Sequence, residues 1–233
     1  MRQLALQIQN AAPRTLENFV CGRNAEVVHA LKQAVEAPQR DTLITLWGPP
    51  GSGKTHLVEA MEGALQAAGR APGLVRGRTL PTPESLQARV LLIDDVDCLN
   101  AVAAEAVFHA WNRLRDRGGV LICTAQDAPA ALPLAAELSS RLAWGALFRL
   151  HPLDDQEKLL ALQARATVEG IPIAEEALRY LLSRWPRYLP SLMSALTLLD
   201  GLSLSSKRAI TIPLIRDFLL TQAGDTTLEP LCD

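Results

Sequence analysis

The sequence predicts an α/β domain built around a parallel sheet, followed by a small domain made only of helices. Short apolar, β-branched segments alternate with helical patterns up to about residue 150, which is typical of βαβ units. After Pro152 only the apolar spacing of helices recurs. Hydrophobic residues make up 48% of the 233 residues and aromatic residues only 4%. The core is therefore expected to be aliphatic, and wholesale disorder is excluded.

The expected strands are short apolar segments bounded by turn residues. They cover residues 42–47, 73–76, 90–93, 120–123 and 147–150. A turn at Cys21 and Gly22 precedes a helical pattern over residues 27–35, and further helical patterns cover 57–65 and 101–115. This alternation predicts a parallel sheet with helices in its crossovers.

The helical domain is predicted to start at a capping box, with Asp154 at the N-cap and Glu157 three residues later. An apolar stripe at residues 177–185 and a pattern over 189–202 predict two further helices. A last helix is expected to open at Thr211 and to end near Leu220. The expected domains are an N-terminal arm at 1–12, the α/β domain at 13–151, the helical domain at 152–222 and a flexible tail at 223–233.

Charge and cysteine usage exclude several classes of protein. The formal net charge of −2 argues against a strongly basic protein that coats nucleic acid, although a local basic patch is still compatible with it. Four scattered cysteines without a CxxC pattern argue against a disulfide framework or a zinc site. No signal peptide is expected, and the sequence contains no apolar stretch of about 18 residues. A cytoplasmic protein with reduced thiols and no membrane span is expected.

A phosphate-binding loop follows the first expected strand. The segment fits G-x-x-x-x-G-K-[ST] and consists of Gly48, Pro49, Pro50, Gly51, Ser52, Gly53, Lys54 and Thr55. Its glycines would let backbone N–H groups turn toward phosphate oxygens, and Lys54 would add a charge as a solvent-facing part of the loop. Thr55 would offer a hydroxyl to Mg²⁺. A plain glycine turn is the alternative, which the strand before and the helix after disfavour.

A pair of acids ends the third expected strand. Asp94 is predicted to hold Mg²⁺, through water, and Asp95 to orient or polarise an attacking water molecule. In a parallel sheet both carboxylates would lie at the same edge as the phosphate-binding loop. The alternative is a solvated turn after a buried strand, which the upstream loop makes less favourable.

Several segments resemble the DnaA and Hda branch of the AAA+ ATPases, from Thr15 to about Leu220. The matching segments are 15–24, 47–56, 91–95, 138–145, 152–154 and 210–214. The resemblance implies a three-layer αβα AAA+ domain followed by a helical lid, which binds ADP or ATP with Mg²⁺. It implies that Phe19, Gly22 and Asn24 belong to a sequence motif that lies beside the adenine. His56 is the last residue of the matching segment that contains the phosphate-binding loop, and it is expected to lie at the nucleotide. Hydrophobic packing is the alternative role for Phe19.

The resemblance also implies catalytic roles. Arg141 matches the arginine finger that reaches the nucleotide of a neighbouring subunit, and Gln126 stands at the first sensor, where the initiator has Asp. Pro190 replaces the arginine of the second sensor, and Arg187 lies one turn earlier as a substitute. At most a weak intrinsic ATPase is therefore expected. Trp111 and Trp144 are expected to be packing residues.

The N-terminal arm resembles the peptide by which Hda binds the replication sliding clamp. An extended peptide of this kind places a glutamine amide in a polar pocket and apolar side chains in a cleft. The expected contacts are Gln3, Leu4, Leu6 and Ile8. The match is imperfect, because Gln7 stands where proline is usual. A chance match is the alternative.

The resemblance implies a regulator that binds DnaA and the clamp and stimulates hydrolysis of DnaA-bound ATP, which prevents re-initiation. No DNA-reading module is expected after the lid, and residues 77–89 are too short for the initiator's single-strand-binding insertion. Direct sequence-specific DNA binding is therefore not expected, whereas a homo-oligomer stays open. The alternatives are an autonomous AAA+ ATPase of the helicase-loader or initiator type and a nucleotide-binding scaffold.

Overall fold

The computed structural model describes residues 13–36 and 42–225. The contacts divide the chain into two compact units, of which the first ends at Pro152 and the second begins at Leu153. The predicted arm at 1–12 and residues 226–233 of the predicted tail lie outside the described residues. The two units are described separately below.

The first unit contains the predicted parallel sheet. Its strands are β1 (Thr42–Trp47), β2 (Gly73–Arg76), β3 (Val90–Asp94), β4 (Val120–Ala125) and β5 (Ala146–Arg149). All neighbouring pairs are parallel, and the strand order is β2-β3-β4-β1-β5. The predicted strands are confirmed, with β3 and β4 running further than expected. This order places the carboxyl ends of β1, β3 and β4 beside one another, which is where ligands bind in open parallel sheets.

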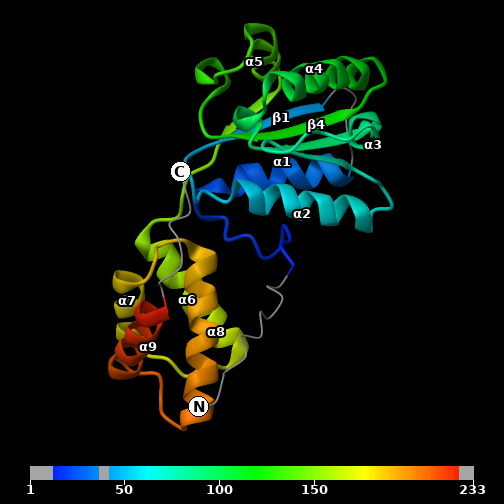
Figure 1. Ribbon diagram of the computed structural model, residues 1–233. Coiled ribbons are helices and arrows are strands. Elements are labelled where there is room, and N and C mark those ends of the chain that lie inside the picture. Colours follow the sequence, from blue (N-terminus) through cyan, green and yellow to red (C-terminus); the bar gives the residue numbers. More distant parts are fainter. Residues whose placement is uncertain (1–12, 37–41, 226–233) are drawn as a thin grey trace. The chain divides into compact units, whose positions relative to one another are not determined.

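Helices cover both faces of the sheet (Figure 1). On one face lie α1 (Ala25–Glu36) and α2 (Lys54–Ala67), and on the other lie α4 (Ala101–Asp116) and α5 (Ala136–Leu142). A short helix, α3 (Pro83–Gln87), follows β2, and 3₁₀ turns cover Gly22–Asn24, Val96–Cys98 and Pro129–Ala131. The sequence patterns did not predict α3 or α5, because neither is long enough to show a clear apolar period.

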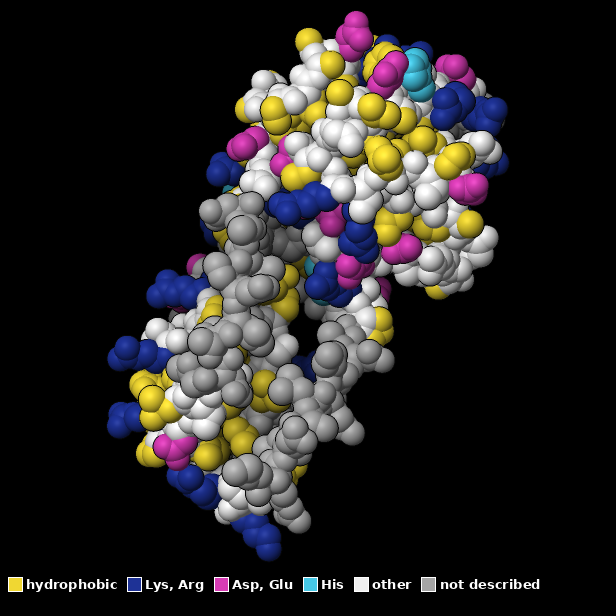
Figure 2. Space-filling view, viewed as in Figure 1, with side chains coloured by type: hydrophobic (Ala, Val, Ile, Leu, Met, Phe, Trp, Pro, Cys, Tyr) yellow, Lys and Arg dark blue, Asp and Glu magenta, His cyan; other side chains and the backbone are white. Residues whose placement is uncertain are grey.

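The side chains of each central strand alternate between two aliphatic cores. Leu92 and Ile122 pack with α1 and α2, whereas Leu91 and Leu121 pack with α4 and α5. All four side chains are fully buried. This alternation is the period of a strand covered on both faces, and it gives the near-continuous apolar segments seen in the sequence. The exposed face of the unit carries interspersed basic and acidic side chains (Figure 2).

The second unit is helical, as predicted. It consists of α6 (Asp155–Glu169), α7 (Glu175–Arg184), α8 (Leu189–Ser206) and α9 (Ile212–Asp225), with one isolated parallel bridge between Ile173 and Ile210. The capping box is confirmed by two hydrogen bonds of 2.8 Å. Asp154 Oδ1 accepts a hydrogen bond from Glu157 N, and Glu157 Oε2 accepts one from Asp154 N.

The end predicted for the last helix is wrong. α9 continues past Leu220 to Asp225. Ile215 and Phe218 anchor this helix in the core of the unit, and no proline occurs between Leu220 and Asp225 to break it. None of the helices in the described part of the chain is long and apolar enough to cross a membrane.

Candidate nucleotide site

The phosphate-binding loop connects β1 to α2, as predicted. Gly48 N donates to the carbonyl oxygen of Ala125 over 3.1 Å, which ties the start of the loop to the end of β4. A Cβ atom on Gly48 would collide with the carbonyl oxygen of Leu150. Gly51 and Gly53 have φ angles of 79° and 96°, in the left-handed region that favours glycine. The backbone path of the loop therefore depends on these glycines.

Lys54 lies inside this loop. Its side chain is only 7% exposed, and Nζ donates to the carbonyl oxygens of Gly48 at 2.6 Å and Pro49 at 3.2 Å. The expectation that Lys54 faces solvent is wrong. A buried ammonium group needs hydrogen-bond partners, and the loop's own carbonyl groups provide them. The positive charge is thus held at the centre of the loop.

Two further observations fit a phosphate ligand in this loop. Ser52 is 5% exposed, and its buried hydroxyl has no hydrogen-bond partner within the described residues. Thr55 is half-buried in the first turn of α2, where the helix N-terminus presents unpaired backbone N–H groups. A phosphate would satisfy both the hydroxyl and these donors.

Phe19 and His56 pack together beside the loop. A Cβ atom built on Gly53 would lie 2.6 Å from Phe19 Cε2, so the phenyl ring lies directly against this glycine. The rings of Phe19 and His56 are 5.3 Å apart at their centroids. His56 Nε2 donates to the carbonyl oxygen of Thr15 over 3.0 Å. Burial lowers the pKa of the His56 imidazole, and the hydrogen bond to Thr15 opposes this shift. His56 thereby holds the Thr15–Phe19 segment against α2.

The Asn24 side chain has a structural role, because it hydrogen-bonds to the backbone of His151. It is 2% exposed, its Nδ2 donates to the carbonyl oxygen of His151, and its Oδ1 accepts from His151 N, both over 2.8 Å. Gly22 is exposed and has a φ angle of 46°. The Asn24 side chain is thus fully engaged, and a base-reading role for this segment would fall to its backbone groups.

Asp94 lies at the end of β3, where it is 5% exposed. Its Oδ1 accepts a hydrogen bond from Thr124 Oγ1 over 2.8 Å, and the same hydroxyl oxygen accepts from Asp95 N over 2.8 Å. Thr124 is fully buried at the end of β4 and fixes both aspartates. The sequence analysis missed Thr124; its only signal was a polar residue near the end of an apolar strand.

Asp95 adopts a left-handed conformation, with a φ angle of 56°. Partial burial, together with the charges of Asp94 and Asp97, raises the pKa of the Asp95 carboxyl. Asp97 Oδ1 accepts from the backbone N–H of Gln126 over 3.2 Å, and the Gln126 side chain is exposed. The structure thus brings the predicted Asp94, Asp95 and Gln126 to one edge of the sheet.

The donor set fits Mg²⁺ only together with a nucleotide. Within residues 13–36 and 42–225, no group of three or more His, Cys, Asp or Glu side chains could hold a metal ion. Mg²⁺ is usually bound by one or two protein ligands together with water molecules and substrate phosphates. Thr55 and Asp94 are the side chains that would hold it here, and the ion would neutralise phosphate charge.

Arg141 lies apart from these residues, on α5. Its Nη1 donates to Asn112 Oδ1 over 2.8 Å, and its guanidinium carbon lies 5.1 Å from the ring centroid of Phe108 and 5.2 Å from that of Trp144. Trp144 is 66% exposed, so it packs outside the core. It lies directly after α5 and stacks on the guanidinium, whereas Trp111 is 4% exposed and packs in the core as expected.

The second unit contains the position of the second sensor, Pro190, and its expected substitute, Arg187. Pro190 lies in the first turn of α8, where the missing backbone N–H of proline has no helical partner to lose. Arg187 Nη1 lies 3.5 Å from Asp155 Oδ2, and the arginine side chain is 66% exposed. Arg187 is therefore a surface residue in an ion pair within this unit.

Comparisons with known proteins agree with this architecture. Residues 155–219 match the family model described as "Hda, lid domain". Domain III of the replication initiation protein DnaA from Thermotoga maritima is 22% identical, with a TM-score of 0.72 over 90% of this chain and 98% of that one. AMPPCP-bound DnaA from Aquifex aeolicus is 21% identical, with a TM-score of 0.68 over 84% of this chain and 68% of that one. RuvB from Thermotoga maritima is 20% identical, with a TM-score of 0.66 over 93% of this chain and 73% of that one.

These matches carry different weight for the two units. The solved structures are too distant in sequence to show more than the AAA+ fold of the α/β unit and its helical partner. The family model assigns the helical unit to the Hda lid. Residues 155–219 are thus similar to the Hda lid, and the chain shares the AAA+ fold of domain III of DnaA.

Proposed function

We propose that this chain is an Hda-like regulator of replication initiation that binds adenine nucleotide and promotes hydrolysis of ATP bound to the initiator DnaA. The observation that carries the proposal is the half-buried Arg141 of α5, whose guanidinium is held between Phe108, Asn112 and Trp144. An arginine held in this way is suited to reach a nucleotide on another subunit.

Nucleotide binding is supported by the loop. The buried ammonium of Lys54, the unpaired hydroxyl of Ser52 and the start of α2 together suit an anion of the size of a phosphate. The similar DnaA from Aquifex aeolicus was solved with AMPPCP bound. We propose ADP or ATP as the ligand, with Mg²⁺ held through Thr55 and Asp94.

The proposed chemistry takes place on the partner's nucleotide. Charge accumulates on the transferred phosphoryl group in the transition state, and a guanidinium placed there stabilises it. Arg141 would supply that charge, while this chain's own Asp94, Asp95 and Gln126 would serve its own nucleotide. In this proposal the chain promotes hydrolysis of the partner's ATP and is not an enzyme with rapid turnover of its own.

The clamp is the second proposed partner. The residues expected to contact it, Gln3, Leu4, Leu6 and Ile8, lie outside the described residues, so this part of the proposal depends on the sequence. Deletion of residues 1–12 should abolish clamp binding and leave nucleotide binding unchanged. A truncated chain that keeps its clamp affinity would contradict this assignment.

An autonomous ATPase of the helicase-loader or initiator type is the alternative function. The arrangement of Asp94, Thr124 and Asp95 favours it, because it places a carboxylate pair at the phosphate edge. Pro190 in place of the sensor arginine opposes it. Steady-state turnover by the isolated chain above roughly 1 s⁻¹, the low end of ordinary catalytic rates, would favour the alternative.

The central experiment is single-turnover hydrolysis of ATP preloaded on DnaA, with DNA-loaded clamp and either wild-type chain or Arg141→Ala. We expect the wild type to accelerate hydrolysis and the variant to lose most of that effect while still binding nucleotide. Arg149→Ala is the matched control, because Arg149 also stacks on a tryptophan, 5.3 Å from the ring centroid of Trp47. Equal stimulation by wild type and Arg141→Ala would remove Arg141 from the mechanism.

A further inference from the structure

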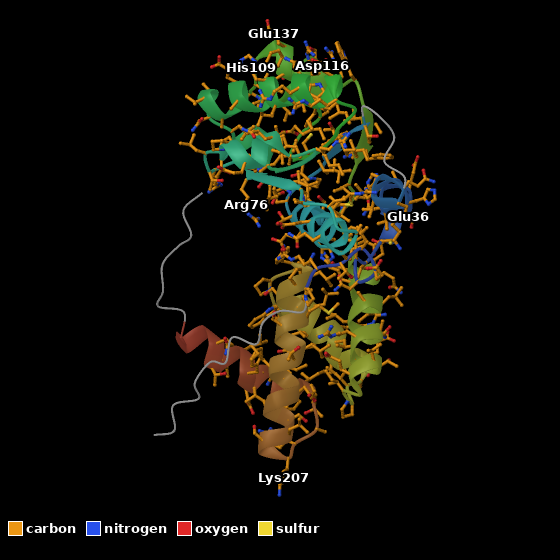
Figure 3. The ribbon with its side chains drawn as sticks, turned by 90° about the vertical axis from the view of Figure 1, so that its right-hand side faces the viewer. Glu36, Arg76, His109, Asp116, Glu137 and Lys207 are labelled. Carbon is orange, nitrogen blue, oxygen red and sulfur yellow. The ribbon has the colours of Figure 1, made fainter. Side chains whose placement is uncertain are left out.

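Arg76 forms a second cationic contact at the phosphate edge of the sheet. It ends β2 and stands opposite Asp94 in the parallel register of β2 and β3. Its Nη1 lies 3.9 Å from Asp94 Oδ2, and its Nη2 lies 3.6 Å from Oε1 of Glu59 on α2. Figure 3 shows the Arg76 side chain projecting at the edge of the α/β unit. Arg76 therefore joins the predicted metal carboxylate to the helix that follows the phosphate-binding loop.

The two oxygens of Asp94 have different surroundings. Oδ1 accepts the hydrogen bond from Thr124 Oγ1 over 2.8 Å, and this contact is buried. Oδ2 faces the guanidinium of Arg76. A Mg²⁺ ion or one of its water ligands would therefore meet Asp94 mainly through Oδ2, where a positive charge already lies.

We propose that Arg76 is a positioning residue that acts through Asp94 by competing with Mg²⁺ for Oδ2. The guanidinium serves as an internal cation for this carboxylate, so the site binds nucleotide with a weaker dependence on Mg²⁺ than an unpaired aspartate would give. This inference depends on the proposed nucleotide binding and goes beyond it, because the phosphate-binding loop alone does not require a cation at β2.

The surroundings of Arg76 allow Mg²⁺ to replace its guanidinium beside Asp94. The Arg76 side chain is 47% exposed, so its own charge would meet solvent if it moved away from Asp94, and Mg²⁺ would then be the cation beside the buried carboxylate. Glu59 offers it an alternative partner, although Glu59 Oε2 also pairs with Arg14 Nη1 over 3.1 Å. An arginine keeps its charge at every physiological pH, so the competition does not depend on protonation.

The test is binding of a fluorescent ADP analogue to the full chain, measured across a Mg²⁺ titration and in EDTA. We expect Arg76→Ala to lower the Mg²⁺ concentration at half-saturation by about twofold to fivefold, the upper part of the range that corresponds to loss of one partly exposed ion pair. The ratio of the dissociation constants in EDTA and in Mg²⁺ should rise by a similar factor. Arg76→Lys keeps the charge and should stay within about twofold of the wild type.

Arg14→Ala is the matched control. It breaks the other ion pair of Glu59 but leaves the contact between Arg76 and Asp94 in place. An unchanged Mg²⁺ dependence in Arg76→Ala would overturn the inference, and so would an equal shift in Arg14→Ala, because the effect would then act through Glu59. Wild-type chain that binds no nucleotide in either condition would overturn the proposed nucleotide binding and this inference with it.

Discussion

Arg141 and Asn112 are joined by a hydrogen bond of 2.8 Å from Nη1 to Oδ1, although they lie on different helices and 29 positions apart in the chain. Among the residues that the structure describes, the contacts of the arginine are thus a neutral amide and two aromatic rings, and not a carboxylate. A carboxylate partner would neutralise the guanidinium and compete with a phosphate for it. The amide restricts the orientation of the guanidinium and leaves its full charge available.

Asn112→Ala should weaken the action of Arg141 without changing the chain's own nucleotide affinity. A hydrogen bond of this kind contributes about 0.5–1.5 kcal/mol, so the stimulation of DnaA-bound ATP hydrolysis should fall by about twofold to tenfold. Single-turnover hydrolysis with DNA-loaded clamp measures this change. Glu105→Gln is the control on the same helix, because the Glu105 side chain is 75% exposed and does not contact Arg141. An unchanged rate in Asn112→Ala would show that the amide does not orient the arginine.

Lys54→Ala should weaken ADP binding by about tenfold to a hundredfold, the loss expected for charge-assisted hydrogen bonds to a phosphate. The ammonium is already inside the loop, bonded to the carbonyl oxygens of Gly48 and Pro49. Isothermal calorimetry gives the affinity, and thermal unfolding shows whether the loop keeps its stability. Lys32→Ala is the control, because that side chain is 43% exposed and pairs only loosely with Glu17, at 3.9 Å. Equal affinity in wild type and Lys54→Ala would contradict the phosphate site.

Asp95→Asn should raise the stability of the folded chain at neutral pH. The pKa of Asp95 is raised by burial and by the neighbouring acids, so the folded state binds its proton more tightly than the unfolded state does. The ionised carboxylate therefore costs stability, and this cost grows as pH rises from the ordinary value of 3.8 through the folded pKa. Asparagine removes the charge and tolerates the left-handed conformation.

The measurement for Asp95→Asn is the midpoint of urea unfolding at pH 7, with Asp116→Asn as the exposed control. A lower midpoint in Asp95→Asn than in the wild type would show that the carboxylate makes a stabilising contact that its surroundings do not indicate. A higher midpoint together with lost turnover would be the pattern expected of a residue kept for function rather than for stability.

The sequence predicted the elements that depend on local patterns. The five strands, the helices of the second unit and the capping box at Asp154 each follow from apolar spacing or from a residue pair three positions apart. The glycine loop was placed correctly for the same reason, because its strand, turn and helix are consecutive. Short helices such as α5 escaped prediction, since seven residues give too few apolar positions to define a period.

The contacts that define the candidate site join segments far apart in the chain. Thr124 meets Asp94 because β4 lies beside β3, and Phe108 meets Arg141 because α4 and α5 cover the same face of the sheet. Neither contact can be predicted from the spacing of residues within either segment. The burial of Lys54 was also hidden, because the sequence shows a charged residue after glycines but not the carbonyl groups that surround it.

The burial of His56, whose imidazole donates to the carbonyl oxygen of Thr15, makes the attachment of the Thr15–Phe19 segment sensitive to acid. The His56 imidazole has a pKa below its ordinary value of 6.5, chiefly because it is buried. Between the lowered folded pKa and 6.5, the unfolded chain binds a proton at this position and the folded chain does not. The stability that depends on neutral His56 is therefore complete above pH 6.5, and it decreases as pH falls below 6.5 toward the folded pKa.

His56→Gln removes this titration while its amide can still donate to the carbonyl oxygen of Thr15. The free energy of unfolding from urea titrations at pH 7.5 and pH 5.5 should therefore decrease more in the wild type than in His56→Gln. His29→Gln is the control, because His29 is exposed on α1 and its ring nitrogen lies 3.0 Å from the side-chain nitrogen of Gln33. Carboxylates that titrate in the same range are common to all three chains, so their contributions cancel in the difference. An equal decrease in wild type and His56→Gln would mean that acid does not loosen this segment, and that Phe19 holds it against Gly53 without help from the imidazole.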